Sequence, residues 1–224
     1  LRDAKLDGVD MKNIHFKNDD ILLNEAFDIL NRESELYLPT ARKGQSGFTP
    51  WKSYDKANDQ IMLEAVNVYG SAKEILFPQT ERMYSFRTNG DAVEVITSFE
   101  DTQPRIIFGL RACDLAAISC LDDVFLTRGY EDSYYQARRD NVTLIVNACY
   151  QPGPNCFCNA MGVDCVNPVG ADVIIRDAGD VYVWEAQNPK GEAATAMIAS
   201  LLEDREVGLP SLKPFAKEVN FAGV

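Results

Sequence analysis

Cysteine is the residue type in this sequence whose number and spacing point most clearly to chemistry. The chain has six cysteines and one histidine, His15. The cysteines all fall within 53 residues, and none precedes residue 113; they are Cys113, Cys120, Cys149, Cys156, Cys158 and Cys165. In a cytosolic chain such clustering favours metal binding or redox chemistry over structural disulfides. The single histidine disfavours histidine-rich zinc catalysis and a Rieske centre.

Two of the cysteines follow predicted buried strands. Cys113 comes just after the apolar run 105–110, and Cys149 comes just after the apolar run 142–146. A helix is predicted over 115–126, because its apolar residues fall on one helical face. The order strand, helix, strand predicts parallel strands joined by a right-handed crossover. Both cysteines should therefore emerge at the carboxyl edge of the sheet, where open α/β sheets place ligands.

The next two cysteines lie in a loop that must turn sharply. Pro152, Gly153 and Pro154 stand between Cys149 and the pair formed by Cys156 and Cys158. Residues of these types favour tight turns, so the loop is expected to fold back on the sheet edge. Four thiols could then converge at one site.

Three occupants of such a site remain open from spacing alone. Four thiolates suit an iron–sulfur cluster, either [4Fe–4S] or [2Fe–2S], or a structural Zn²⁺, and the third alternative is a set of unligated thiols. The spacing C-x₃₅-C-x₆-C-x-C differs from the runs of bacterial ferredoxins and from the paired C-x₂-C of zinc ribbons. The tight C-x-C pair favours a cluster, where neighbouring thiolates can bind different irons.

Several neighbours are candidates for tuning the site. Asp114 is predicted to cap the helix that follows Cys113, and the positive helix N-terminus should favour the Cys113 thiolate. Arg111 is interpreted either as a surface residue or as a donor to a cluster sulfur or an anionic partner. The backbone N–H groups of Gly153 and Asn155 are candidate donors to cluster sulfurs.

The remaining cysteines and the histidine have simpler interpretations. Cys120 falls inside the predicted helix and is expected to be a small buried residue. Cys165 is interpreted as a spare thiol, or as an alternative ligand that replaces one of the four. His15 is expected to be a surface residue.

The elements around the cysteine region predict a mixed α/β fold. The dipeptide Asn89-Gly90 stands between two strand-like runs and predicts a β-hairpin. Segment 43–56 is predicted to be a loop because it contains glycine, proline and polar residues, and 60–68 is left unassigned. The other predictions are helices over 20–33, 132–139 and 192–203 and strands over 35–39, 84–86, 93–99, 173–175 and 181–184.

Together these elements predict an α/β fold with a mixed, partly parallel sheet. A β-hairpin arm and a cysteine-rich loop at the carboxyl edge of the sheet complete the expected architecture. A single domain is expected over residues 1–206, with its cysteine-rich site over 113–165. An irregular tail is expected over 207–224, because its apolar pattern is sparse and it contains two prolines.

Composition excludes several classes of protein. The chain has 224 residues, of which 46% are hydrophobic and 25% charged, as in an ordinary globular protein. Its net charge of −12 and its lack of a lysine- and arginine-rich run argue against nucleic-acid binding. No stretch of 18 apolar residues predicts a membrane span, and the polar N-terminus has no signal-peptide core. The expected location is the cytoplasm.

The sequence also resembles a known family. The carrying motifs are Gly109–Asp114, Leu121–Leu126, Asn147–Cys149 and Cys156–Gly162, together with Ser71–Glu81 upstream. They resemble the N-terminal region of iron–sulfur electron-transfer subunits, namely the beta subunit of cytoplasmic nickel–iron sulfhydrogenases and the A subunit of anaerobic sulfite reductase. The resemblance covers about residues 35 to 175.

This resemblance implies a function for the thiols. It implies that Cys113, Cys149, Cys156 and Cys158 ligate an iron–sulfur cluster, expected to be [4Fe–4S]. It also implies electron transfer between a flavin- and NAD(P)-binding subunit and a catalytic redox subunit or a ferredoxin. Such subunits continue into a ferredoxin-like domain with further cysteine runs, which this chain lacks. Either the chain is a fragment whose tail leads toward a missing domain, or it has a reduced role.

Two competing functions are carried forward. The first is a zinc-bound or metal-free thiol-rich domain that holds a multi-subunit complex together. The second is an enzyme that uses the Cys113 thiol as nucleophile, and it is weakened by the lack of a histidine base near any of the cysteines. On the main interpretation the chain is a component of an oxidoreductase complex rather than a catalyst by itself.

Overall fold

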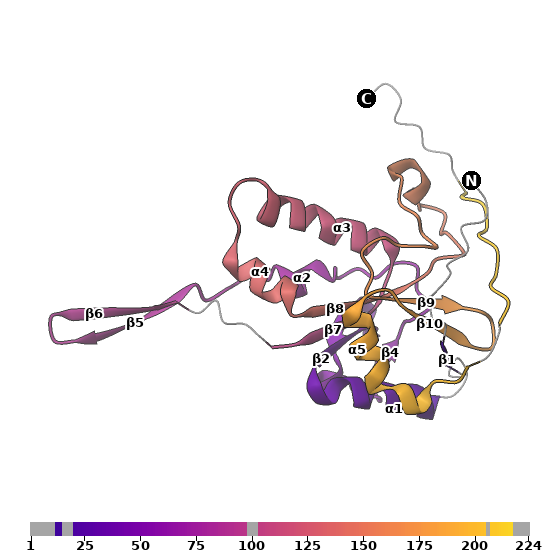
Figure 1. Cartoon of the computed structure of the whole chain (residues 1–224), viewed down its shortest axis with the longest axis horizontal. Coiled ribbons are helices and arrows are strands. Elements are labelled where there is room, and N and C mark those ends of the chain that lie inside the picture. The colour runs from indigo at the N-terminus through magenta and orange to yellow at the C-terminus, as the bar shows by residue number, and fades with distance from the viewer. Residues whose placement is uncertain (1–11, 15–19, 98–102, 205–206, 217–224) are drawn as a thin grey trace, which may run out of the picture.

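The computed structural model describes residues 12–14, 20–97, 103–204 and 207–216. Its centre is a mixed sheet with the strand order β1-β10-β9-β8-β7-β2-β3, in which β4 also pairs with β2 (Figure 1). The strands are β1 Lys12–Ile14, β2 Glu35–Arg42, β3 Gln45–Pro50, β4 Asp59–Ile61, β7 Arg105–Leu110, β8 Val142–Asn147, β9 Val173–Asp177 and β10 Tyr182–Ala186.

Five α-helices accompany the sheet in the described part of the chain. They are α1 Asp20–Glu33, α2 Lys73–Leu76, α3 Ala112–Asp122, α4 Ser133–Asp140 and α5 Pro189–Met197. A π-helical turn, Asp123–Thr127, extends α3, and short 3₁₀ turns occupy Trp51–Ser53, Cys158–Met161 and Ala199–Leu201.

The middle of the sheet is parallel, as the sequence predicts. β7 runs parallel to β2 and to β8, and β8 runs parallel to β9. The helices α3 and α4 lie in the crossover between β7 and β8. Parallel strands are usually covered on both faces, which explains why these segments read as nearly continuous apolar runs.

Successive strand residues divide between two cores on opposite faces of the sheet. Ile106 and Phe108 belong to the core that contains Phe27 of α1, whereas Ile107 belongs to the core that contains Ile118 of α3. Figure 1 shows α1 and α5 on one face and α2, α3 and α4 on the other. Burying each such large apolar side chain contributes about 1.5–3 kcal/mol, so the two cores fix the strand ends that carry the cysteines.

Local chemistry explains where two of the helices begin. The Asp132 side chain accepts a hydrogen bond from the Tyr135 N–H (2.8 Å) and caps α4. The Asn188 side chain accepts from the Gly191 N–H (3.1 Å) and caps α5, whose first residue is Pro189. Both cap types are favoured because they satisfy N–H groups that have no partner within the helix.

The prediction of a loop over 43–56 is wrong. This segment contains β3 and a 3₁₀ turn, and β3 pairs with β2 through a turn at Lys43 and Gly44. Both turn residues have positive φ, 49° and 81°, as a tight hairpin turn of the primed type requires. Glycine is common in loops, but Gly44 here forms the turn of a hairpin. The unassigned region 60–68 contributes to β4.

The predicted arm is present as a separate antiparallel hairpin, β5 Tyr84–Asn89 and β6 Ala92–Thr97. It extends away from the body of the protein (Figure 1). Cross-strand pairing places Phe86 opposite Val95, and both side chains are exposed. The part of the second predicted strand beyond Thr97, including Phe99, lies outside the described residues, as does His15.

Two predicted helices have different bounds in the structure. The helix predicted over 115–126 begins at Ala112 and passes into the π-helical turn. The helix predicted over 192–203 begins at Pro189 and ends at Met197. Residues 207–216 contain no helix or strand, as expected for the start of the tail. Within the described ranges, no helix is long and apolar enough to cross a membrane.

Candidate functional site

The cysteines that follow β7 and β8 reach the same edge of the sheet. Cys113 lies in the first turn of α3, three residues after β7 ends, and Cys149 lies two residues after β8 ends. Because β7 and β8 are parallel, their carboxyl ends are neighbours. The predicted placement of both cysteines at the carboxyl edge is therefore confirmed.

Cys158 connects the predicted ligands. Its thiol shares a hydrogen bond with the Cys113 thiol and interacts electrostatically with Cys156 and Cys149. It also begins the 3₁₀ turn at the tip of the proline-containing loop. The loop therefore folds back as its prolines and glycine predict, and it brings four of the six cysteines into one neighbourhood.

Cys165 lies in the same neighbourhood. It is buried, and its carbonyl accepts a hydrogen bond from the Cys149 N–H (2.8 Å). Desolvation, followed by the neighbouring Cys149 and Cys158, raises the pKa of the Cys165 thiol to about 11. Its two predicted roles, a spare thiol and an alternative ligand, both stay predictions.

The prediction that Cys120 is buried is wrong. The α3 helix packs on the sheet through Leu115 and Ile118, which are three residues apart and share one helical face. Cys120 follows Ile118 by two residues, so it points away from that face and is exposed. This cysteine has no part in the thiol neighbourhood that Cys158 organises.

Asp114 caps α3 from a different position than predicted. Arg111 occupies the N-cap position, and the Asp114 carboxylate accepts a hydrogen bond from the Arg111 backbone N–H (3.0 Å). This reciprocal arrangement is a capping box, with Asp114 at the third helical position. The helix therefore begins earlier than expected and includes Cys113.

The helix N-terminus favours the Cys113 thiolate as predicted, but other effects outweigh it in the free thiol. Desolvation by the surrounding protein, followed by the charges of Asp114 and Cys158, raises the pKa of Cys113 to about 12. Backbone hydrogen bonds at the helix start lower this pKa, but by less. Burial and like charges thus outweigh the helix dipole. A thiol held in its protonated form is a poor nucleophile, which weakens the thiol-enzyme alternative.

Arg111 is partly buried, so its interpretation as an ordinary surface residue is wrong. Its Nε donates to the Ala65 carbonyl (3.0 Å), and its Nη2 donates to the Leu63 carbonyl (2.7 Å). Desolvation lowers the pKa of Arg111, and Cys149 is the strongest of the charges that oppose this shift. Its hydrogen bonds therefore go to carbonyl oxygens, while its positive charge lies beside the thiols.

The loop backbone already donates to one sulfur. The Gly153 N–H makes a hydrogen bond with Cys156 Sγ (3.2 Å). This is the kind of contact predicted for Gly153, although it is made to a free thiol. Asn155, the other predicted donor, is exposed.

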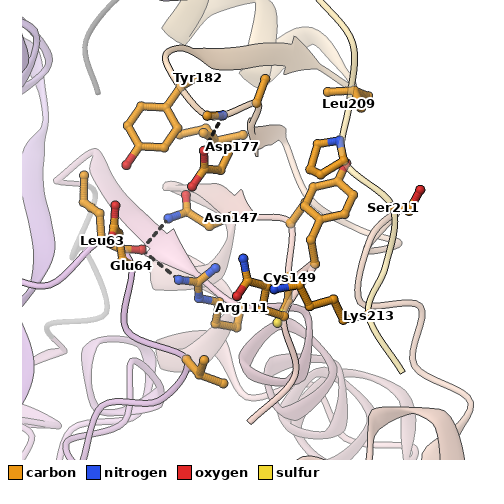
Figure 2. Close-up of a pocket in the computed structure, with 18 of the residues that line it drawn as sticks. Leu63, Glu64, Arg111, Asn147, Cys149, Asp177, Tyr182, Leu209, Ser211 and Lys213 are labelled. Atoms are coloured by element: carbon orange, nitrogen blue, oxygen red, sulfur yellow. Dashed lines mark hydrogen bonds between the residues drawn. The ribbon is translucent and has the colours of Figure 1, made fainter. Parts of the chain in front are cut away.

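A cleft of about 840 Å³ opens beside the thiols, and sequence analysis missed it (Figure 2). Its lining includes Arg111 and Cys149 at the strand ends, Asn147 at the end of β8, and Leu209 and Lys213 from the tail. One signal was available in the sequence, since Asn147 is a polar residue that directly follows an apolar strand. The contribution of the distant tail had no such signal.

The thiol set fits a metal group by its donor chemistry. Thiolates are the ligands of iron–sulfur clusters and of many structural zinc sites. The positively charged Arg111 and the Gly153 N–H suit the negative charge that such a group would carry. Among the described residues, no group of three or more His, Cys, Asp or Glu side chains is arranged to hold a metal ion.

Fold and site together define a mixed α/β domain with a thiol-rich loop at the carboxyl edge of its sheet. The chain is similar to a protein named sulfhydrogenase 2 subunit beta, from Pyrococcus furiosus. The two are 23% identical over 212 residues, an alignment that covers 89% of this chain. The chain spans 59% of the length of that relative. The resemblance to the sulfhydrogenase beta subunit is therefore confirmed.

The remaining comparisons found no further similar protein. No family model matches the chain, and no solved structure matches it. The resemblance to the A subunit of anaerobic sulfite reductase stays a prediction.

Proposed function

We propose that this chain is an iron–sulfur electron-transfer subunit, or part of one, in a hydrogenase-type redox complex. The observation that carries the proposal is that Cys158 shares a hydrogen bond with Cys113 and interacts electrostatically with Cys149 and Cys156 at the sheet edge. The similarity to a sulfhydrogenase beta subunit supports the same function. Because the chain spans little more than half of that relative, the activity of the complex is part of the proposal.

Each residue of the site has a proposed role. Cys113, Cys149, Cys156 and Cys158 would hold the cluster, and Cys165 is the alternative ligand. Bound there, the cluster would accept and release single electrons. The Gly153 N–H would donate to a ligand sulfur and thereby favour the reduced state.

Arg111 and Asp114, which flank Cys113, have supporting roles in the proposed site. Arg111 would offset negative charge near Cys149, since its guanidinium interacts electrostatically with that thiol. Asp114 would fix the start of α3 and with it the position of Cys113. No residue of this chain needs to act as a nucleophile or to transfer a proton.

The finer features of the proposal follow the family resemblance. We propose a [4Fe–4S] cluster, partners that include a flavin- and NAD(P)-binding subunit and a catalytic redox subunit or ferredoxin, and a cytoplasmic location. We also propose a domain over residues 1–206 and a tail that leads toward a ferredoxin-like domain. The net charge of −12 favours protein partners over nucleic acid.

The experiment is anaerobic purification followed by measurement of iron, acid-labile sulfide, zinc and the absorbance spectrum. We expect about four irons and four sulfides for each chain and a broad band near roughly 400 nm that dithionite bleaches. Cys158→Ser should remove the band. Cys120→Ser is the matched control, because Cys120 is exposed and is not among the predicted ligands.

Two outcomes would overturn the proposal. Stoichiometric zinc without sulfide would identify the chain as a zinc-bound assembly domain instead. Failure to take up iron and sulfide, even after anaerobic reconstitution, would leave a metal-free assembly role.

A further inference from the structure

The cleft beside the thiols contains hydrogen-bonding atoms that the proposed electron transfer does not use. It lies at the carboxyl ends of β7, β8 and β9, which is where open α/β sheets bind ligands. Its volume of about 840 Å³ is in the range of small-molecule sites. Cys149 lines one side of the cleft, so a molecule bound there would lie next to the thiol loop.

Two side chains in the cleft are fixed by one shared acceptor. The Leu63 carbonyl accepts from Asn147 Nδ2 (3.0 Å) and from Arg111 Nη2 (2.7 Å), as Figure 2 shows. The second bond of Arg111, to the Ala65 carbonyl, fixes its guanidinium plane. The amide and the guanidinium are therefore held side by side before any ligand arrives, as specific binding requires.

Each of these side chains keeps one unused hydrogen-bonding atom. Asn147 is buried, and its Oδ1 has no hydrogen-bond partner. Within the described ranges, Arg111 Nη1 makes no hydrogen bond and Arg111 forms no ion pair with a carboxylate. Buried acceptors without partners are rare in folded proteins, and each asks for an explanation. The pair offers one acceptor and one donor to a molecule in the cleft.

The wall of the cleft is mixed, with rings and apolar side chains beside the charged side chains of Glu64, Asp177 and Lys213. The ring of Tyr182, the ring of Pro210 and the side chains of Leu209, Ile175 and Val66 line it. Sites that combine apolar and aromatic side chains with a few fixed polar groups bind small organic molecules and orient them, and the two rings offer faces on which a flat molecule can stack. The polar pair then determines which edge of the ring can enter.

We propose that this cleft binds a planar organic molecule whose edge carries a carbonyl next to an N–H, such as an aromatic carboxamide or a lactam ring. The carbonyl accepts from Arg111 Nη1, and the N–H donates to Asn147 Oδ1. The flat ring lies between Tyr182 and the tail residues. This site goes beyond the proposed electron transfer and does not depend on whether the thiols hold a cluster.

The test uses two small probes of similar shape, benzamide and methyl benzoate, titrated against the full chain by ligand-observed saturation-transfer NMR. Both have the carbonyl, but only benzamide has the N–H. We expect saturable binding of benzamide and about tenfold weaker binding of methyl benzoate, as for the loss of one buried hydrogen bond. The lactam 2-pyridone should compete with benzamide.

Variants identify the site. Asn147→Val should abolish the preference for benzamide, so that benzamide and methyl benzoate bind about equally. Asn67→Ala is the control, because Asn67 is exposed and does not line the cleft. If Asn147→Val does not fold, the comparison of benzamide with methyl benzoate on the unchanged chain still tests whether the cleft prefers a ligand with an N–H.

Equal binding of both probes, or no saturable binding of benzamide, would overturn the inference. The iron and sulfide content of the same samples is measured separately. A chain that binds a cluster but shows no probe preference would therefore refute the cleft site alone. A chain that shows the preference without iron would refute only the cluster.

Discussion

Arg176 and Glu185 form a buried, two-pronged ion pair that connects β9 to β10. Arg176 Nε and Nη2 each lie 2.8 Å from a Glu185 carboxylate oxygen. Arg176 also donates to the Val166 carbonyl (2.8 Å) and the Asn167 side chain (3.0 Å). One guanidinium thus ties the sheet to the segment that follows Cys165, so it positions the end of the thiol loop.

Removing one partner of this pair should be strongly destabilising. Glu185→Ala leaves the buried Arg176 charge uncompensated, and we expect a loss of about 3–5 kcal/mol in the free energy of unfolding. Urea denaturation measures this loss. Lys52→Ala, which breaks the ion pair of the exposed Lys52 with Glu35, is the comparison and should cost about 0–1 kcal/mol. Similar losses for the two variants would contradict the structural role assigned to Arg176.

A second ion pair predicts acid sensitivity. Hydrogen bonds from Arg42 and from the Asp55 backbone lower the pKa of Asp59 from 3.8 to about 2. A lowered folded-state pKa contributes stability that is present above about pH 4 and is lost as the pH falls from 4 toward 2. Thermal melting from pH 2 to 6 should show this loss for the native chain. Arg42→Ala should flatten the dependence of the melting temperature on pH. An unchanged dependence would show that Asp59 does not cause the acid sensitivity.

Gly191 should resist substitution although it lies in a helix. Alanine normally stabilises a helix interior by about 1 kcal/mol relative to glycine. Here a Cβ atom would lie 2.0 Å from the Asp172 carbonyl oxygen, so α5 must move away from the sheet. We expect Gly191→Ala to lower the free energy of unfolding by about 1–3 kcal/mol. Gly208→Ala, where a Cβ meets nothing within 4 Å, should be close to neutral in the same thermal melts.

The hydrogen bond from Gly153 predicts a shift in potential if the thiols hold a cluster. Gly153→Pro removes the N–H that donates to Cys156 Sγ, so the midpoint potential should fall. Gly153→Ala keeps the N–H, and its Cβ would lie 3.6 Å from Cys156 Sγ, an ordinary contact. A spectroelectrochemical titration should therefore find the alanine variant near the native value. Equal potentials for the proline variant and the native chain would show that the bond has no electronic role.

The parts of the fold that sequence could predict are those set by local patterns. The buried strands β7 and β8 were recognisable because their apolar runs are uninterrupted, and the β5–β6 hairpin because of Asn89-Gly90. The positions of Cys113 and Cys149 followed from those strands. The β2–β3 hairpin was missed because Gly44 serves equally well in a loop and in a hairpin turn.

The parts that sequence could not predict depend on contacts between distant segments. Leu63 and Asn147 are 84 residues apart, and only the folded chain shows that one carbonyl serves both Asn147 and Arg111. The exposure of Cys120 depends on which face of α3 meets the sheet. The capping role of Asp114 depends on where the helix begins, and end positions are the least certain feature of a periodic pattern.

The β5–β6 hairpin lies outside the strand order that builds the body, because the chain leaves the body after α2 and returns at β7. Its strands pair only with each other, and Tyr84 and Phe86 face solvent with Val95 on the same side of the ribbon. Two-stranded ribbons are marginally stable in water, whereas central strands open only with the whole domain. Amide hydrogen exchange should therefore occur at two distinct rates. The amides of the β5–β6 hairpin should exchange early, long before those of β7 and β8.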